Sequence, residues 1–343
     1  MFEEFFLPVK IQGLHNHPID WNSSSTFPHE GKIKLMIFGV TNRQTDYTYF
    51  PICRAMRDLV WNVSSNNKIA HLGIFVDNNH GTALSKLIRF LIKKYPEVRF
   101  LIYGLDGHET ALNSSTDLFT RSTFFMPGIQ SQNFPLIPEI ISSRKFDRII
   151  FAGLQQYLVS PDYQKLASYP EVDIWYLRNT DPSRTESIVR DAYTVWVDYH
   201  VLARGVTGSE HLPHPAGLTM QQWAAMFYYT GLSPVNRVMI LSHTNPADLT
   251  SADAETLAVG IWHYYEGLKN KMNDYPFIPI QNLIKKEVYM HDFRTYVYNN
   301  PETKRWWIAI PGTNGSEHLL PIPEQTARSV IQSKDVDELL KYW

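Results

Sequence analysis

Carboxylate and imidazole side chains lie close together in the sequence at four places, and these residue types bind metal ions and transfer protons. The four clusters are Asp77–His80, Gly104–Glu109, Asp198–His200 and Glu210–His214. In two of them an aspartate and a histidine are separated by one residue, Asp106 with His108 and Asp198 with His200. Because side chains alternate along a strand, residues two apart point to the same face and can bind one metal ion. A solvated loop or a hydrogen-bonded pair has the same spacing, so the sequence leaves both interpretations open.

Other chemical motifs are missing from the sequence. It contains no Gly-Lys-Ser/Thr phosphate loop, and Gly104–Gly107 is too short for a dinucleotide fingerprint. It contains no Gly-x-Ser-x-Gly elbow, and the single cysteine, Cys53, has no evident histidine partner in the sequence. These observations argue against nucleotide binding and against a serine or cysteine nucleophile.

The elements that must position the clusters alternate between short apolar runs and amphipathic segments. Strands are predicted over Ile33–Val40, Arg99–Tyr103, Arg148–Ala152, Asp173–Leu177, Thr194–Val197 and Arg237–Leu241. Helices are predicted over about Tyr49–Val60, Thr82–Lys94, Thr219–Tyr229 and Ser251–Lys271. This alternation predicts a three-layer α/β fold with a mainly parallel sheet and helices on both faces. The clusters follow predicted strands, and ligands bind at the carboxyl ends of strands in such sheets.

The chain divides into three parts by pattern. Residues 1–31 show no sustained period and are predicted to form an irregular arm, whereas residues 32–272 carry the α/β pattern. From residue 273 to 343 the composition changes, and we expect a small antiparallel extension packed on the same domain. Its predicted elements are strands over Glu287–Met290, Thr295–Tyr298 and Trp306–Ile310, a Pro-rich turn, and a last helix over about Pro323–Trp343.

Three aromatic pairs stand out, Tyr228-Tyr229, Tyr264-Tyr265 and Trp306-Trp307. We expect them to pack in the core, and a ligand pocket or a subunit interface is the alternative. The extension that carries the Trp pair is a candidate contact surface, and a cap over the domain's own core is the other interpretation.

Composition narrows the class of protein. A chain of 343 residues with 44% hydrophobic side chains can bury a full core. Lys and Arg total 32 against 34 Asp and Glu, without a block of like charge, so neither nucleic acid nor an anionic membrane is an expected partner. No apolar stretch reaches the roughly 18 to 20 residues that cross a bilayer. A single cysteine and an N-terminus without a secretion pattern predict a reducing compartment, most simply the cytoplasm.

Motifs in the second half of the chain carry a family resemblance. These motifs are Val195–Leu202, Pro215–Thr219, Ile240–Pro246 and the Ala-rich helix that follows. In order and spacing they resemble the arginase/agmatinase superfamily of ureohydrolases. Three further segments resemble a formimidoylglutamase-like branch of it, namely Gly153–Pro161, Asn273–Pro276 and Arg305–Trp307. The resemblance implies an arginase-like three-layer fold.

The resemblance also implies a chemistry. Active members hydrolyse guanidino or formimidoyl groups with a water that bridges two Mn²⁺ ions. Two hard divalent ions held close together require several bridging carboxylates in addition to imidazoles, so that the shared water loses a proton near neutral pH. Carboxylates are therefore the diagnostic residues of an active site of this kind.

The first two metal motifs of the family are incomplete here. The Gly-Gly-Asp-His motif falls on Gly104–Gly107, which leaves glycine where a ligand histidine is expected, although His108 is adjacent. The Asp-x-His-x-Asp motif should lie between Ala111 and Arg144, where the only carboxylates are Asp117 and Glu139.

The third motif and the substrate-facing position are also changed. The Asp-x-Asp motif becomes Asp198-x-His200, which keeps one carboxylate. In the Glu-Val-Asn-Pro motif Asn245 matches, but the glutamate expected to face the cationic group of the substrate is His243. An imidazole does not replace that negative charge.

We therefore expect a cleft without a binuclear site and, in the first instance, without any metal or other cofactor. The candidate residues of this cleft are Asp106, His108, Asp198, His200, His243 and Asn245. If one metal ion is retained, the residues expected to bind it are Asp198, His200 and His108.

Three functional hypotheses follow. The first is an arginase-fold protein that has lost catalysis and acts as a binding or assembly protein. The second is a hydrolase of linear amidine or guanidino C–N bonds that uses Mn²⁺ or Zn²⁺ in a rebuilt site, with His211 or His214 as further candidates. The third is a metal-free sensor of a small molecule bound by His243 and Asn245. Because family members commonly form trimers or hexamers, a homo-oligomer or another protein chain is the expected partner.

Overall fold

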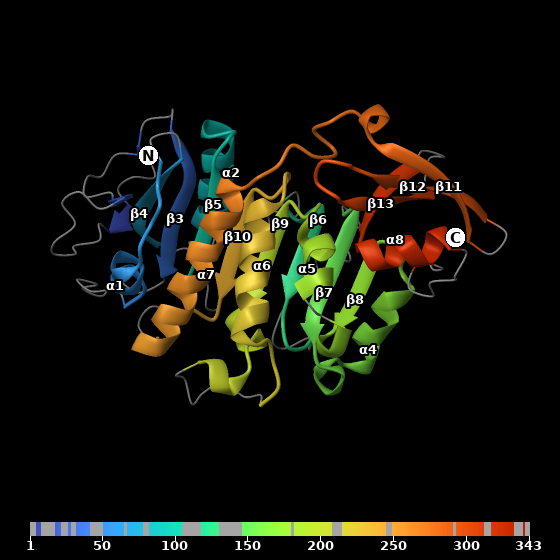
Figure 1. Ribbon diagram of the computed structural model, residues 1–343. Helices are drawn as coiled ribbons and strands as arrows, with labels where there is room; N and C mark the ends of the chain where they lie inside the picture. Colours follow the sequence, from blue (N-terminus) through green and yellow to red (C-terminus); the bar gives the residue numbers. More distant parts are fainter. Residues whose placement is uncertain are drawn as a thin grey trace.

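The structure is a computed structural model, and it describes residues 5–7, 18–21, 27–28, 32–41, 51–64, 67–77, 82–104, 118–129, 146–179, 182–207, 215–244, 249–290, 293–311, 317–332 and 339. A ten-stranded sheet forms the centre of the molecule, in the order β1-β4-β3-β5-β10-β9-β6-β7-β8, with β2 also paired to β4 (Figure 1). Its strands are β1 (Phe6–Leu7), β2 (Ile19–Trp21), β3 (Ile33–Thr41), β4 (Lys68–Val76), β5 (Arg99–Tyr103), β6 (Arg121–Phe125), β7 (Arg148–Leu154), β8 (Val172–Tyr176), β9 (Thr194–Asp198) and β10 (Val238–Ser242). Apart from the antiparallel β1–β4 pair, the described strand pairs of this sheet are parallel, as predicted.

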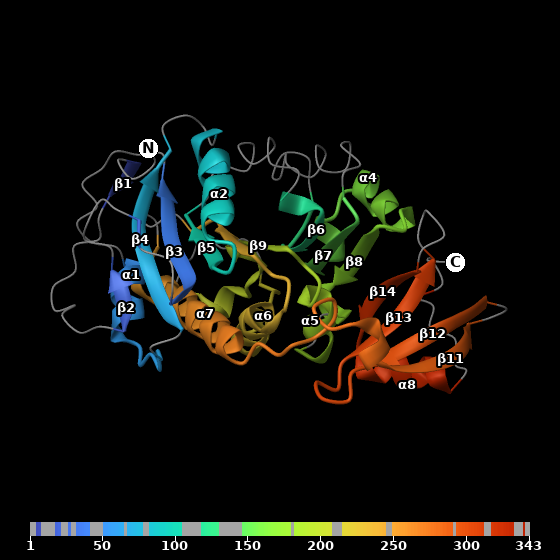
Figure 2. The ribbon, with the colours of Figure 1, turned by 90° about the horizontal axis from the view of Figure 1, so that it is seen from above.

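Helices cover both faces of the sheet, as the alternating pattern predicts (Figure 2). They are α1 (Pro51–Asp58), α2 (Thr82–Lys94), α4 (Pro161–Gln164), α5 (Pro182–Val189), α6 (Met220–Leu232) and α7 (Ser251–Lys269). Helices α1, α5, α6 and α7 pack into one core and α2 into the other, one core on each face. Along β3, Leu35 and Ile37 belong to the first core and Met36 and Phe38 to the second. A strand buried on both faces is therefore apolar throughout, which is why it appears in the sequence as a continuous run.

Side-chain caps explain where the two long helices begin. Thr219 accepts a hydrogen bond from the amide of Gln222 in a capping box, and Thr250 does the same with Asp253. Each box satisfies amides that the first turn of a helix leaves without partners. Helix α6 then extends three residues beyond the predicted Tyr229, to Leu232, and α7 ends at Lys269.

The C-terminal extension is a four-stranded antiparallel sheet with one helix. Its elements are β11 (Ile284–Met290), β12 (Phe293–Asn299), β13 (Trp306–Pro311), β14 (Glu317–Ile322) and α8 (Glu324–Ile331). Arg305 joins it to α5 and to the preceding loop, because its guanidinium lies 2.9 Å from Glu186 Oε1 and 3.2 Å from Asp274 Oδ2. Trp307 is buried, with the guanidinium of Arg190 4.7 Å from its ring centre. These contacts attach the extension to the α/β part of the chain, while the apolar residues of the extension pack among themselves.

Several elements differ from the sequence prediction. Within the arm, Phe6–Leu7 and Ile19–Trp21 are strands that pair with β4, and strands this short show no period in the sequence. The Pro-rich turn contains a strand, β14. Helix α8 begins at Glu324, close to the predicted start, and ends at Ile331, and most of the residues between Ile331 and the predicted end at Trp343 lie outside the described residues. Strands β4 and β6 and helix α5 were not predicted.

The aromatic pairs behave largely as expected. Tyr264 and Tyr265 are fully buried in the core, whereas Tyr228 and Tyr229 are partly exposed.

Among the helices of the described residues, none combines the length and the apolar character needed to cross a membrane.

Candidate functional site

Two neighbouring strands end at the same edge of the sheet and deliver the candidate site. Strands β9 and β10 are parallel, and Asp198 at the end of β9 is level with Ser242 at the end of β10. The residues that follow each strand therefore meet at this edge, as the carboxyl ends of parallel strands do. They are His200, in a short 3₁₀ helix, and His243.

Asp198 lies at the centre of a three-residue group, Asp198–His200–His243. Its Oδ1 accepts a hydrogen bond from the amide of His200 at 2.9 Å and lies 3.2 Å from the Nδ1 of that residue. The Nδ1 of His243 lies 2.9 Å from the same oxygen. The two imidazole rings are close neighbours, with centres 4.3 Å apart.

The local backbone explains how the two histidines reach one carboxylate. Asp198 caps the 3₁₀ helix Tyr199–Val201, which turns the chain back so that the His200 amide faces it. His243 has a φ of 55°, in the left-handed region that costs a non-glycine residue about 1 kcal/mol. Such strain persists where surrounding contacts over-determine it, and it concentrates at functional positions.

The electrostatics of the group favour an ionised carboxylate. Burial raises the pKa of Asp198. The positive charge of His243 and the hydrogen bonds from both histidines lower it by more, so that the pKa lies well below its usual range. The side chain of Asp198 is only 11% exposed, whereas those of His200 and His243 are 32% and 30% exposed. A ligand that approaches from solvent would therefore meet the imidazoles.

The structure brings together three of the six residues predicted to line the cleft, and the other three, Asp106, His108 and Asn245, lie outside the described residues. The further candidates His211 and His214 lie outside them as well. The last described residue before Asp106 and His108 is Gly104, and one hydrogen bond holds it beside the group. The amide of Gly104, at the end of β5, donates a hydrogen bond of 2.7 Å to Thr244 Oγ1, next to His243.

The first polar cluster of the sequence has a structural role at its described residue. Asp77 is buried, and its Oδ2 accepts a hydrogen bond of 3.2 Å from the amide of Leu84 in the first turn of α2. A carboxylate at this place satisfies an amide of the helix start and is stabilised by the helix dipole.

The sequence analysis placed His243 on the substrate side and named His108 as the third ligand, with Asp198 and His200, if one metal ion is retained. In the described part of the chain the residue beside Asp198 and His200 is instead His243, and ligand atoms of the three lie within 4.8 Å of one another. The neighbouring positions of β9 and β10 in the sheet bring them together. That pairing is not visible in a single sequence, because 45 residues separate Asp198 from His243.

The donor set decides which metal fits. One carboxylate and two imidazoles suit a single Zn²⁺-like transition metal ion, which takes nitrogen and oxygen ligands in a tetrahedral site. A pair of Mn²⁺ ions requires several bridging carboxylates. The Asp198–His200–His243 group supplies one, so it does not fit the two-manganese centre that the family resemblance implies.

A second polar group lies in the core and corrects the expectation that Cys53 has no histidine partner. The Sγ of Cys53 lies 3.6 Å from His71 Nε2 and 3.6 Å from the Tyr103 hydroxyl. Burial raises the pKa of Cys53 to about 12 and lowers the pKa of His71 to about 3. Both groups are therefore neutral near pH 7, and a neutral thiol is a poor nucleophile. This group is a hydrogen-bonded part of the core.

Comparison with solved structures identifies related folds. Formimidoylglutamase from Bacillus subtilis matches 74% of this chain over 91% of its own, at 15% identity and a TM-score of 0.57. Trypanosoma cruzi formiminoglutamase with Mn²⁺ matches 72% of this chain over 98% of its own, at 12% identity and a TM-score of 0.57. The agmatine ureohydrolase of Thermoplasma volcanium matches 70% over 91%, at 11% identity and a TM-score of 0.51. No family model and no curated protein matches the sequence. At these identities the likeness establishes the fold.

Proposed function

From the arginase-like fold that this chain has, we propose that it is a ureohydrolase relative without the two-manganese centre and without ureohydrolase activity, acting as a binding or assembly protein. The observation that carries the proposal is the Asp198–His200–His243 group, in which two imidazoles share the single carboxylate. A binuclear manganese site needs several carboxylates at that place.

The sequence supports the same conclusion outside the described group. Between Ala111 and Arg144 the chain carries only two carboxylates, Asp117 and Glu139, and they are too far apart to form an Asp-x-His-x-Asp motif. The ligands that this motif supplies in active members of the family are therefore missing from the segment where they are expected.

The substrate side supports the loss of activity independently. The resemblance places a glutamate at the position of His243, where it would face the cationic amidine or guanidinium of the substrate. In this chain the imidazole there is hydrogen-bonded to Asp198. It supplies no negative charge to a cation, so the cleft loses recognition of the substrate as well as activation of water.

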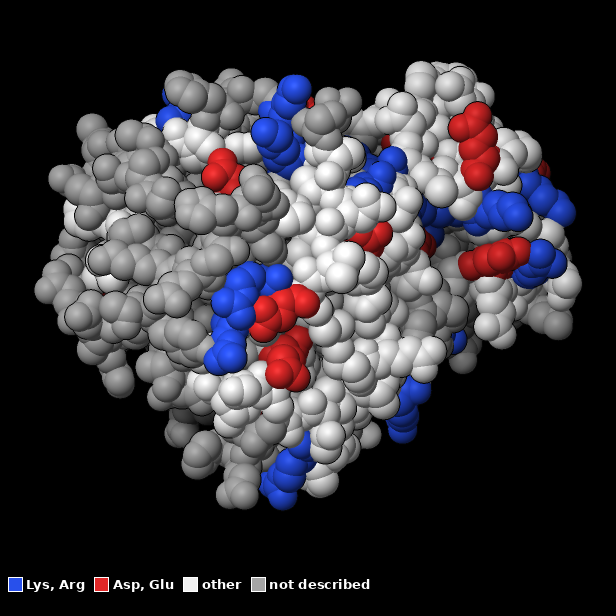
Figure 3. Space-filling model, turned by 60° about the vertical axis from the view of Figure 1, so that its left-hand side comes forward, with Lys and Arg blue, Asp and Glu red and all other residues white. Residues whose placement is uncertain are grey.

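A binding role fits what remains. The partly exposed imidazoles of His200 and His243 form a surface at the carboxyl edge of the sheet that a small ligand can contact. A homo-oligomer or another protein chain is the partner that we propose for assembly. On the face shown in Figure 3, Lys and Arg side chains lie beside Asp and Glu, which favours such partners over nucleic acid. The single buried Cys53 is compatible with the cytoplasmic location that the sequence predicts.

One observation favours a second candidate function. Because ligand atoms of Asp198, His200 and His243 lie within 4.8 Å of one another, these residues would hold one Zn²⁺ or Mn²⁺ ion. Such an ion, when bound, lowers the pKa of its water toward neutrality, which is the chemistry that hydrolysis of a linear amidine or guanidino C–N bond requires. The alternative is therefore a one-metal hydrolase.

Metal content separates the two functions. The full-length protein, purified without chelator and dialysed against Mn²⁺ and Zn²⁺, is subjected to elemental analysis and tested for turnover of guanidino and formimidoyl compounds. The test variant is His243→Ala, and the matched control is His318→Ala, which removes an exposed histidine of β14.

No bound metal and no turnover would support the binding protein. One metal per chain, lost in His243→Ala and retained in His318→Ala, together with turnover, would replace it by the one-metal hydrolase. Two metals per chain would overturn both.

A further inference from the structure

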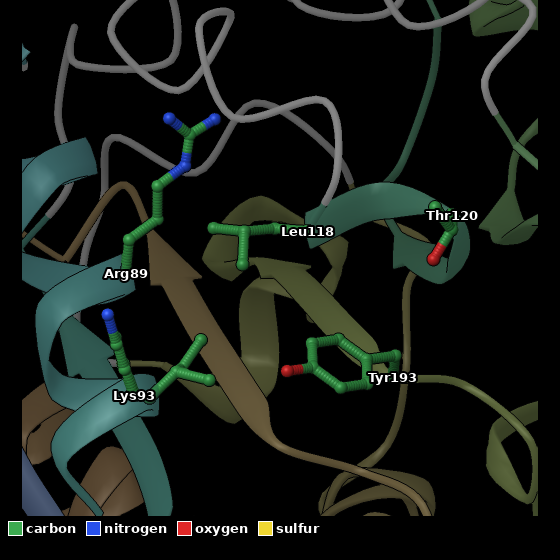
Figure 4. A pocket seen from close by; sticks show the side chains of 6 residues that line it. Arg89, Lys93, Leu118, Thr120 and Tyr193 are labelled. Carbon is green, nitrogen blue, oxygen red and sulfur yellow. The ribbon is translucent and has the colours of Figure 1, made fainter.

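Two cavities have volumes within the range of small-molecule sites. The first, of about 380 Å³, lies beside α2, and Figure 4 shows the hydroxyl of Tyr193 pointing toward the helix that carries Arg89 and Lys93. The second, of about 520 Å³, lies between the α/β part of the chain and the C-terminal extension. A buried guanidinium that lacks one hydrogen-bond partner borders the second cavity, which indicates a ligand site there.

Both parts of the chain contribute to the walls of the second cavity. Figure 2 shows the extension beside α5. Residues that border the cavity include Tyr229, Leu232 and Met272 of the α/β part and Lys304, Arg305 and Trp306 of the extension. A ligand bound here would therefore contact both parts.

Arg305 is the polar anchor of this cavity. Its side chain is 7% exposed, its Nε lies 2.9 Å from Glu186 Oε1, and its Nη1 lies 3.2 Å from Asp274 Oδ2. Its Nη2 is buried and has no hydrogen-bond partner. Buried polar groups in proteins are nearly always hydrogen-bonded, so this exception calls for an explanation. A ligand in the cavity that supplies an acceptor would satisfy the remaining N–H.

The charges around Arg305 favour an acceptor with a single negative charge. Glu186 and Asp274 carry two negative charges, and these neutralise Arg190 and Arg305. Lys304 adds a further positive charge at the cavity wall, and it is exposed to solvent. An anionic acceptor forms the stronger kind of hydrogen bond with a guanidinium or an ammonium.

Glu324 and Tyr229 also border the cavity. Glu324 already pairs with Arg328, whose Nη2 lies 2.6 Å from its Oε1, so this carboxylate does not offset the charge of Lys304. Burial and the negative charge of Glu186 raise the pKa of Tyr229. The Tyr229 hydroxyl therefore keeps its proton near pH 7 and can donate a hydrogen bond.

The backbone holds Lys304 at the cavity in an unfavourable conformation. Its φ of 57° lies in the left-handed region, which residues other than glycine rarely adopt. The Lys304 amide donates a hydrogen bond of 2.8 Å to the Asn300 carbonyl, and the Asn300 amide donates one of 3.0 Å to the Arg305 carbonyl. These contacts fix the turn, and strain of this kind concentrates at ligand-binding positions.

We propose that this cavity is a second binding site, independent of the site at the carboxyl edge of the sheet, and that it binds a small monocarboxylate with an apolar body. The carboxylate accepts hydrogen bonds from Arg305 Nη2 and the Tyr229 hydroxyl and pairs with the ammonium of Lys304. The apolar body packs against Leu232, Met272 and Trp306.

Calorimetric titration of the full-length protein with 3-phenylpropionate and with 4-methylpentanoate tests the site, and 3-phenylpropionamide serves as the uncharged probe. One test variant is Arg305→Lys, which keeps the charge and removes Nη2. The other is Lys304→Gln, which removes an exposed charge, and Lys304→Arg restores that charge at the same position. The matched control is Lys286→Gln, which removes an exposed cation of β11.

We expect saturable binding of at least one carboxylate, and binding of the amide at least about tenfold weaker. Arg305→Lys should bind that carboxylate at least about tenfold more weakly, and Lys304→Gln about three- to tenfold more weakly, because the exposed charge is screened by solvent. Lys304→Arg and Lys286→Gln should bind it as the parent protein does. At a hundred times its dissociation constant the carboxylate should raise the melting temperature by about 4 °C.

Absence of saturable binding of both carboxylates, equal binding of the amide, or unchanged affinity in Lys304→Gln would overturn the proposal. Unchanged affinity in a folded Arg305→Lys protein would do so as well. If Arg305→Lys does not fold, the comparison of Lys304→Gln with Lys304→Arg decides the outcome.

Discussion

The ion-pair group that joins the extension to α5 permits a quantitative prediction for Glu186→Gln. Glu186 pairs with Arg190, whose Nε lies 2.9 Å from Oε1, and with Arg305 at the same distance from that oxygen. The side chains of Arg190 and Arg305 are 3% and 7% exposed. In the variant Arg305 keeps Asp274 as a partner, whereas Arg190 loses the carboxylate described beside it.

The magnitude follows from that difference. Removing one partner of a buried ion pair destabilises a protein by roughly 3 to 5 kcal/mol. Because Arg305 keeps its pair with Asp274, we expect Glu186→Gln to lower the free energy of unfolding by about 3 kcal/mol, the lower end of that range. For 343 residues the unfolding entropy is about 0.7 kcal/mol per kelvin, so the melting temperature should fall by about 4 °C.

Lowering the pH should reduce the difference in stability between the parent protein and Glu186→Gln. Burial raises the pKa of Glu186, but Arg190 and Arg305 lower it more, so that it lies below its ordinary value of 4.5 in the folded protein. The contribution of the carboxylate is therefore complete above about pH 4.5 and is lost as the pH falls through the lowered pKa. Thermal denaturation followed by circular dichroism from pH 7 to pH 3 measures both effects.

The matched control is Glu324→Gln in α8, which also removes an ion pair at i,i+4 spacing, but one whose partners are 69% and 51% exposed. Exposed pairs of this kind contribute about 0.3 to 0.5 kcal/mol, so this variant should lose less than about 1 °C. If Glu186→Gln is no less stable than Glu324→Gln at pH 7, the buried ion-pair group does not stabilise the attachment of the extension to α5.

Three further predictions use the same physical arguments. Thr250→Ala removes the capping box with Asp253 and should lower the free energy of unfolding, measured in urea, by about 1 kcal/mol. Gly231→Ala would place a Cβ 1.9 Å from the carbonyl oxygen of Tyr264 in α7, and should destabilise by about 3 kcal/mol or separate α6 from α7; an unchanged urea midpoint would contradict this contact. Cys53 should be inert to thiol reagents at pH 8 in the folded protein, because burial raises its pKa to about 12, and should react fully in denaturant.

The predictable part of the fold is the part with repeated local patterns. Thr82–Lys94 and Arg99–Tyr103 have the predicted bounds, because a helix with one apolar stripe and a strand buried on both faces each have an unambiguous sequence pattern. Strand β14 escaped prediction because its Pro321 suggested a turn. That proline is tolerated near the end of a strand at the edge of the small sheet.

The sequence was sufficient to select the residues of the site but not to predict the contacts between them. Residue types and spacing were sufficient to select Asp198 and His200, but the strand geometry assumed for them was wrong. Strand β9 ends at Asp198, and His200 faces the carboxylate because it lies in the 3₁₀ helix that Asp198 caps. His243 was selected for the same cleft, but its direct contact with Asp198 was not predicted, since that contact depends on β10 lying next to β9 and on a left-handed backbone at His243 itself.

The sequence by itself determined the alternation of strands and helices and the apolar strands of a sheet covered on both faces. It also shows that Asp117 and Glu139 are the only carboxylates between Ala111 and Arg144. These properties are local, because each depends on residue types within a few positions of one another. Only the tertiary structure decided that two imidazoles share Asp198, that Cys53 and His71 form a neutral buried pair, and that Arg89 and Lys93 border a cavity with Tyr193. Those contacts join residues far apart in the chain, and strand order and helix packing set them.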